Sequence, residues 1–116
     1  MEDNRFKTYK NCEFVSVYKR LPDSRNEYLI RLRVRENKDD LFGDLKEVII
    51  SSSKLLEGLN KVKNKEINRA YFSYMMADID VYFYDKHYII ENSPTDASYI
   101  SYYLTKKDFD NLINCL

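Results

Sequence analysis

Residues 79–91 have the sequence IDVYFYDKHYIIE, in which two runs of β-forming residues are separated by the dipeptide Asp85-Lys86. We expect this dipeptide to be the two-residue turn of a β-hairpin, although it lacks the glycine that such turns favour. A two-residue turn fixes which residues of the two strands lie opposite each other. The predicted pairs are Tyr84 with His87, Phe83 with Tyr88, Tyr82 with Ile89, Val81 with Ile90, and Asp80 with Glu91.

This register divides the hairpin into two faces of different chemistry, because side chains alternate along a strand. The face without charge should point to the core and contains Ile79, Val81, Phe83, Tyr88 and Ile90. The other face mixes carboxylates, tyrosine rings and the only histidine, and contains Asp80, Tyr82, Tyr84, His87, Ile89 and Glu91. Tyr99, Ser101 and Tyr103 alternate with apolar residues in a later β-type run and can extend this second face. Because tyrosine is enriched where proteins dock, the second face is typical of an interface, unless a helix covers it and its tyrosines belong to the core.

The strands expected elsewhere predict an α+β fold with a mainly antiparallel sheet of five or six strands. Residues 12–19 and 28–35 should pair as a hairpin across a polar loop. The second of these runs has apolar residues on one face and an arginine stripe on the other, which consists of Arg31, Arg33 and Arg35. Residues 71–76 and 99–104 supply further strands.

Two helices complete the predicted fold, one central and one C-terminal. Residues 44–52 fit either the start of a long central helix or a short strand followed by a helix capped by a serine, whereas a helix is expected over at least residues 53–63. Thr105 and Asp108 form a start that resembles a capping box, so a helix should follow it. Its apolar side should contain Phe109, Leu112, Ile113 and Leu116.

The carboxylates of the polar hairpin face need a cation, because Asp80 opposite Glu91, with Asp78 on the same side, places like charges close together. The arginine stripe on a neighbouring strand is the favoured source of that cation. A basic patch on a partner protein is the second candidate. The third is a divalent metal held by Asp78, Asp80 and Glu91, although the D-x-D spacing is a weak metal motif.

The composition limits the size, charge and location that the protein can be expected to have. The chain has 116 residues, 44% of them hydrophobic, and equal numbers of basic and acidic residues, which predicts one domain of 1–116. Up to Arg69 there are 16 basic and 12 acidic residues, and from Ala70 there are 3 and 7, so the two parts carry about +4 and −4. Neither a signal peptide nor a membrane span is visible, and Cys12 and Cys115 lack metal-site spacing, so we expect a cytoplasmic protein with reduced thiols.

No catalytic motif is recognisable. His87 is the only histidine, no serine or cysteine is marked as a nucleophile, and Gly43 and Gly58 cannot form a phosphate-binding loop. We therefore expect no enzyme activity, no catalytic residue and no cofactor.

The leading hypothesis is a small protein-binding inhibitor that blocks a partner by occlusion. The chain is rich in Lys, Asn, Ile and Tyr, which is typical of proteins encoded by AT-rich genomes. Its small size and lack of a catalytic motif are typical of toxin-immunity proteins and of phage inhibitors of host defence. The partners of such proteins are toxins or defence effectors. The expected contact residues are Asp78, Asp80, Tyr82, Tyr84, His87, Glu91, Tyr99 and Tyr103. The alternatives are a metal-dependent hydrolase or nuclease that uses the carboxylates, and a nucleic-acid-binding module that uses the arginine stripe.

Overall fold

The computed structural model describes residues 6–19, 26–35, 41–93 and 98–116, and it has an α+β fold with seven strands and two helices. The strands are β1 (Phe6–Lys19), β2 (Glu27–Val34), β3 (Asp44–Ser51), β4 (Arg69–Tyr74), β5 (Ala77–Tyr84), β6 (His87–Ser93) and β7 (Ser98–Leu104). The helices are α1 (Leu55–Lys63), between β3 and β4, and α2 (Lys106–Asn114), after β7. The predicted class is confirmed, but the predicted number of strands was too low.

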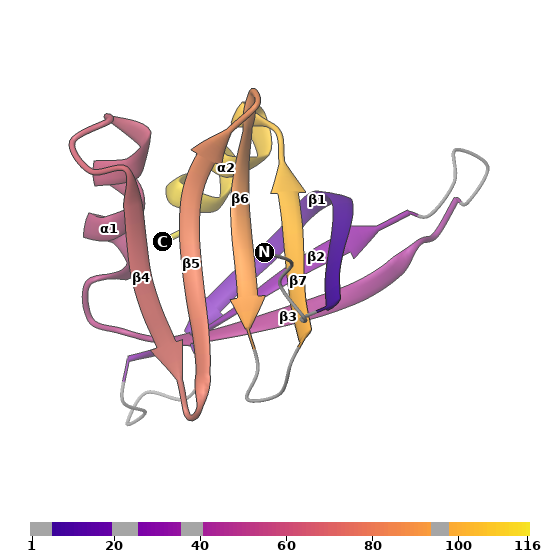
Figure 1. Ribbon diagram of the computed structural model, residues 1–116, viewed down its shortest axis with the longest axis horizontal. Helices are drawn as coiled ribbons and strands as arrows, with labels where there is room; N and C mark the ends of the chain where they lie inside the picture. Colours follow the sequence, from indigo (N-terminus) through magenta and orange to yellow (C-terminus); the bar gives the residue numbers. More distant parts are fainter. Residues whose placement is uncertain (1–5, 20–25, 36–40, 94–97) are drawn as a thin grey trace.

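The strands form a closed barrel in chain order, in which all neighbours are antiparallel except β1 and β7. β1 closes the barrel because its first part pairs with β7 and its later part pairs with β2, with a register shift between Phe14 and Ser16. The junction between β3 and β4 is narrow, since only Ser51 and Ser73 pair there. Figure 1 shows β4–β7 side by side, with β1–β3 crossing behind them.

The ambiguous segment at residues 44–52 is mostly strand. β3 ends at Ser51 and α1 begins only at Leu55. The predicted serine N-cap is wrong, because the N-cap residue of α1 is Lys54, whose side chain makes no capping hydrogen bond. Ser52 acts just before it, where its hydroxyl accepts a hydrogen bond from the backbone N–H of Lys54.

Both helices pack on the inner face of the sheet. α1 buries Leu55, Leu59 and Val62, and Gly58 lets it approach β4 so closely that a Cβ there would lie 2.7 Å from the ring of Phe72. α2 begins as predicted, with the hydroxyl of Thr105 accepting a hydrogen bond from the backbone N–H of Asp108. Its three buried residues, Phe109, Leu112 and Ile113, were all predicted to face the core.

The hairpin register predicted from Asp85-Lys86 is confirmed pair by pair. Asp85 and Lys86 have φ values of +50° and +67°, which is the left-handed conformation that a two-residue hairpin turn of type I′ requires at both positions. Residues with a side chain adopt this conformation less readily than glycine. The pairing of β5 with β6 therefore holds the turn in a conformation that its own residues disfavour.

Cys12 and Cys115 are both free thiols in contrasting surroundings. Burial, reinforced by the negative charge of Asp108, raises the pKa of Cys12 to about 12, whereas Cys115 is exposed. Because the thiolate is the reactive form, the raised pKa suppresses the reactivity of Cys12 at pH 8.

We therefore expect one of the two thiols to react rapidly with a chromogenic disulfide reagent in the folded protein at pH 8, and both to react in urea. In a Cys115→Ser variant the fast phase should disappear. Equal rates for both thiols in the folded protein would show that Cys12 is not buried in the core.

Candidate functional site: the outer face of β4–β7

Strands β4–β7 present one continuous surface on the side away from the core, because they pair in register along most of their lengths. We call this surface the outer face. It consists of Arg69, Tyr71, Ser73, Asp78, Asp80, Tyr82, Tyr84, His87, Ile89, Glu91, Ser93, Tyr99, Ser101 and Tyr103.

Neither helix covers the outer face. α1 packs against Ala70 and Phe72, and α2 packs its Phe109 ring against Tyr88, all of which point to the opposite side of the sheet. Figure 1 shows α2 behind β5–β7 and α1 beside β4, at the left edge of the four strands. The alternative that a helix makes core residues of these tyrosines is therefore wrong. Tyr84 is 63% exposed, and Tyr71, which the sequence did not single out, is 72% exposed.

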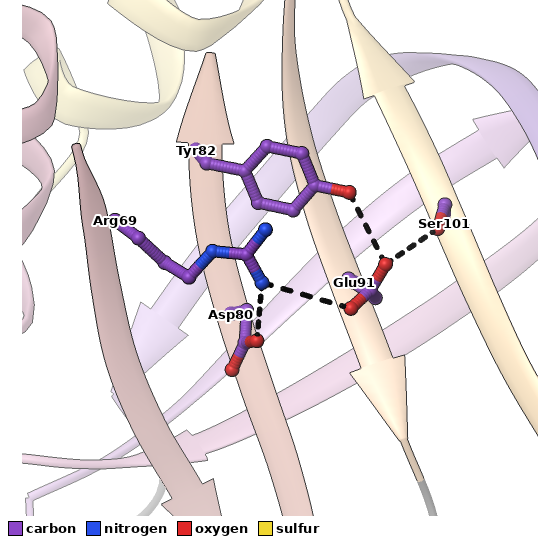
Figure 2. A network of polar contacts seen from close by, with 5 residues as sticks. All are labelled: Arg69, Asp80, Tyr82, Glu91 and Ser101. Atoms are coloured by element: carbon purple, nitrogen blue, oxygen red, sulfur yellow. Dashed lines mark hydrogen bonds and ion pairs between the residues drawn. The ribbon is translucent and has the colours of Figure 1, made fainter. Parts of the chain in front are cut away.

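A polar network occupies the middle of the outer face (Figure 2). One guanidinium nitrogen of Arg69 lies 2.8 Å from a carboxylate oxygen of Asp80 and 4.0 Å from one of Glu91. The guanidinium also lies over the ring of Tyr82, 4.0 Å from its centre. Glu91 in turn accepts hydrogen bonds from the hydroxyls of Tyr82, at 3.1 Å, and Ser101, at 3.4 Å. We call these five residues the Arg69 network.

The electrostatics of the network follow from partial burial. The carboxylates of Asp80 and Glu91 are 20% and 17% exposed. Burial raises the pKa of Asp80, and although the bond from Arg69 lowers it, the charges of Glu91 and Asp78 raise it further. Burial and the neighbouring Glu91 raise the pKa of Tyr82 to about 12. The phenol therefore keeps its proton, which is the one that it donates to Glu91.

The cation beside the carboxylates of Asp80 and Glu91 is the guanidinium of Arg69. The favoured expectation, that the arginine stripe supplies this cation, was therefore wrong. Arg31 and Arg33 lie on β2 and Arg35 directly follows it. Arg31 pairs with Glu47 at 2.9 Å and Arg35 pairs with Glu13 at 2.6 Å. The third member, Arg33, has no ion-pair partner among the described residues.

A signal for Arg69 was present in the sequence but was missed. A hairpin turn at Met75-Met76 pairs β4 with β5 and places Arg69 opposite Tyr82, which lies two residues from Asp80 on the same face. The prediction began its strand at Tyr71 and so left Arg69 outside the sheet.

Two residues of the hairpin lie on the predicted faces but differ in exposure from what the two-face division implied. Phe83 was expected in the core, yet it lies near the end of the hairpin and is 44% exposed, with the ammonium of Lys65 5.9 Å from its ring centre. Ile89 is only 1% exposed although it belongs to the outer face and not to the core cluster. It lies between Tyr82 and Tyr103 in the register, so the neighbouring rings shield it.

The other predicted contact residues lie on the outer face as the register requires. His87 is half-buried, with its ring 5.6 Å from that of Tyr103 and its Nδ1 atom 2.8 Å from the carbonyl oxygen of Asp85. Asp78 is exposed and borders a depression of about 420 Å³. The depression is lined by Arg69, Tyr71, Phe72, Asp78, Asp80, Glu91, Ser93 and Tyr99.

The predicted carboxylate set does not form a metal site. Within the part of the chain that the structure describes, no group of three histidine, cysteine, aspartate or glutamate side chains is arranged to hold a metal ion. The position between Asp80 and Glu91 is taken by the guanidinium of Arg69. The chemistry that the outer face offers is that of partly compensated carboxylates beside tyrosine rings.

Comparison with protein-family models, with curated proteins and with solved structures gives no significant match. Neither of the two described helices is long and apolar enough to cross a membrane. The function is therefore argued from the site itself.

Proposed function

We propose that the protein is a small non-enzymatic inhibitor that binds a partner protein with its outer face and blocks it by occlusion, as immunity proteins and phage counter-defence proteins do. The observation that carries this proposal is the exposure of Tyr71 and Tyr84 on a sheet face that neither helix covers. Exposed tyrosines that surround a partly buried polar centre are typical of docking surfaces.

The charge of the outer face indicates the chemistry of the partner. Its charged side chains are one cation, Arg69, and three carboxylates, Asp78, Asp80 and Glu91, so its formal charge is −2. Asp78 is exposed and has no ion-pair partner among the described residues. A partner surface with exposed lysine or arginine side chains complements this face, and opposite charge speeds association.

The surroundings of Cys12 and His87 favour binding over covalent catalysis. The thiol of Cys12 is buried and its pKa is raised to about 12, which suppresses the thiolate that a nucleophile needs. The ring of His87 contacts Tyr103 and the backbone of Asp85, so its known contacts are structural.

The proposal predicts that a Tyr71→Ala/Tyr84→Ala variant loses its partner and keeps its fold. Both rings are largely exposed, so truncation should change stability little, whereas loss of two interface tyrosines costs about 2 kcal/mol or more, or at least about thirtyfold in affinity. The measurement is quantitative affinity purification from the native host with the tagged wild type and the variant, with circular dichroism to confirm folding.

The matched control is Tyr18→Ala. Tyr18 is 46% exposed but lies on β1, where its ring contacts Arg31 of the arginine stripe. This variant should recover the same partner as the wild type. Equal recovery by the double variant, or loss only in Tyr18→Ala, would refute the outer face as the docking surface.

A further inference from the structure

Within the described part of the chain, one edge of β3 lacks a strand partner over most of its length. It pairs with β2 along its whole length, from Asp44 to Ser51, but it meets β4 only at Ser51. From Asp44 to Ile50 no described strand lies along its other side. The backbone N–H and C=O groups on that side are therefore available to pair with another strand.

The free part of β3 belongs to an arm with an exposed apolar end. Leu41, Phe42 and Leu45 are 77%, 82% and 52% exposed. Figure 1 shows β2 and β3 extending together away from β4–β7, so this end of the arm stands clear of the rest of the molecule. An unpaired edge with apolar side chains beside it is a template for strand addition.

We propose that this edge pairs with the same edge of a second copy of the chain, antiparallel, with the two Leu45 residues facing each other on the two-fold axis. In this register Asp44 of each copy lies opposite Lys46 of the other, so two ion pairs flank the leucine contact. Neither the residues nor the surface of the outer face take part, so this self-association goes beyond the proposed function.

The charges of β3 exclude the neighbouring two-fold registers. Shifting the axis to residue 44, 46 or 47 places Asp44, Lys46 or Glu47 opposite its own copy, and like charges directly opposite are destabilising. An axis near Val48 moves the second strand toward Ser51, where β4 already occupies the edge. The register centred on Leu45 is the one that the charges and the free space both allow.

The pairing between the two copies is short, because β3 begins at Asp44 and the preceding residue, Gly43, has a φ of +61°, which is not an extended conformation. Residues 44–46 of each copy pair, and the exposed Leu41 and Phe42 lie next to the second arm. A contact of this size belongs to the class of small, weak interfaces. Sedimentation equilibrium over a wide concentration range should therefore show a reversible monomer–dimer equilibrium.

The register is tested by disulfide trapping in a Cys115→Ser background, which removes the exposed native thiol. With Leu45→Cys, the new thiols of two copies face each other across the axis, and mild oxidation should give a covalent dimer. With Glu47→Cys as the control, the new thiols lie four residues apart along the paired strands, roughly 13 Å, beyond the reach of about 7 Å for a disulfide. Equal trapping at both positions, or none at position 45, would overturn the proposal.

A charge exchange tests the ion pairs without new thiols. Lys46→Asp places the new carboxylate opposite Asp44 of the second copy on both sides of the axis, and the dissociation constant should rise at least about tenfold. The double variant Asp44→Lys/Lys46→Asp restores opposite charges and should restore the dimer. Both residues are exposed, and circular dichroism confirms the fold of each variant. A wild type that stays monomeric, or a double variant no tighter than Lys46→Asp, would contradict the proposal.

Discussion

Replacing Phe109 by alanine is expected to lower the free energy of unfolding by about 3 to 5 kcal/mol, the range for removing a buried aromatic ring. The side chain is fully buried, and its ring stacks on that of Tyr88 with centres 4.1 Å apart and planes 2° from parallel. This contact fixes α2 to β6 on the inner face. Since domains of this size are stable by about 5 to 15 kcal/mol, the loss is a large part of the total.

Urea denaturation followed by circular dichroism measures this loss. The control is Leu56→Ala on α1, where the side chain is 42% exposed and the change should stay within about 0.5 kcal/mol. A loss below about 1 kcal/mol for Phe109→Ala would show that α2 does not dock on the inner face.

Replacing Arg69 by methionine is expected to cost about 1 to 3 kcal/mol at pH 7. The figure is below the ~3 to 5 kcal/mol for a fully buried pair, because the Arg69 side chain is 35% exposed and solvent screens it. The cost arises because Asp80 and Glu91 lie opposite each other and lose their shared cation.

The pH dependence of this cost identifies its origin. The pKa of Asp80 is raised in the folded protein by burial, so its ionised form already destabilises the fold. Without Arg69 the pKa rises further, and the added cost is present above the folded pKa and disappears as the carboxyl is protonated. The difference between wild type and variant should therefore shrink between pH 7 and about pH 4, where free carboxyls begin to titrate.

Two further variants separate charge from packing at this site. Adding Glu91→Gln to Arg69→Met removes one of the opposed charges and keeps an oxygen to accept from Tyr82, so part of the lost stability should return. Arg31→Met removes an exposed ion pair with Glu47 and should have a much smaller effect than Arg69→Met. A cost for Arg69→Met that is equal at both pH values would mean that lost packing, not repulsion, is responsible.

The hairpin was predictable because its information is local. A two-residue turn at Asp85-Lys86 leaves one antiparallel register, and from it follow the opposed Asp80 and Glu91 and the separation of a charge-free face. The cation that pairs with these carboxylates was not predictable from that hairpin alone. Arg69 lies on β4, and a second turn, at Met75-Met76, places β4 beside β5.

Features that depend on distant pairing were missed or left open. Residues 44–52 have apolar residues at spacings that fit a helix, whereas the structure shows a strand that buries only Val48 and Ile50 and pairs with β4 only at Ser51. The first half of β1 lacks apolar alternation, and its strand conformation comes from parallel pairing with β7, about ninety residues away. Burial of Ile89 on the outer face required knowledge of the flanking Tyr82 and Tyr103.

The central claim is that the outer face meets the partner, and site-specific photocrosslinking in the native host tests it most directly. A photoreactive phenylalanine analogue is placed at position 71, 84 or 18, each the site of an exposed tyrosine. Positions 71 and 84 should give adducts with the same protein, which carries a basic surface, and position 18 should give none. Adducts from position 18 alone, or different proteins at positions 71 and 84, would contradict the claim.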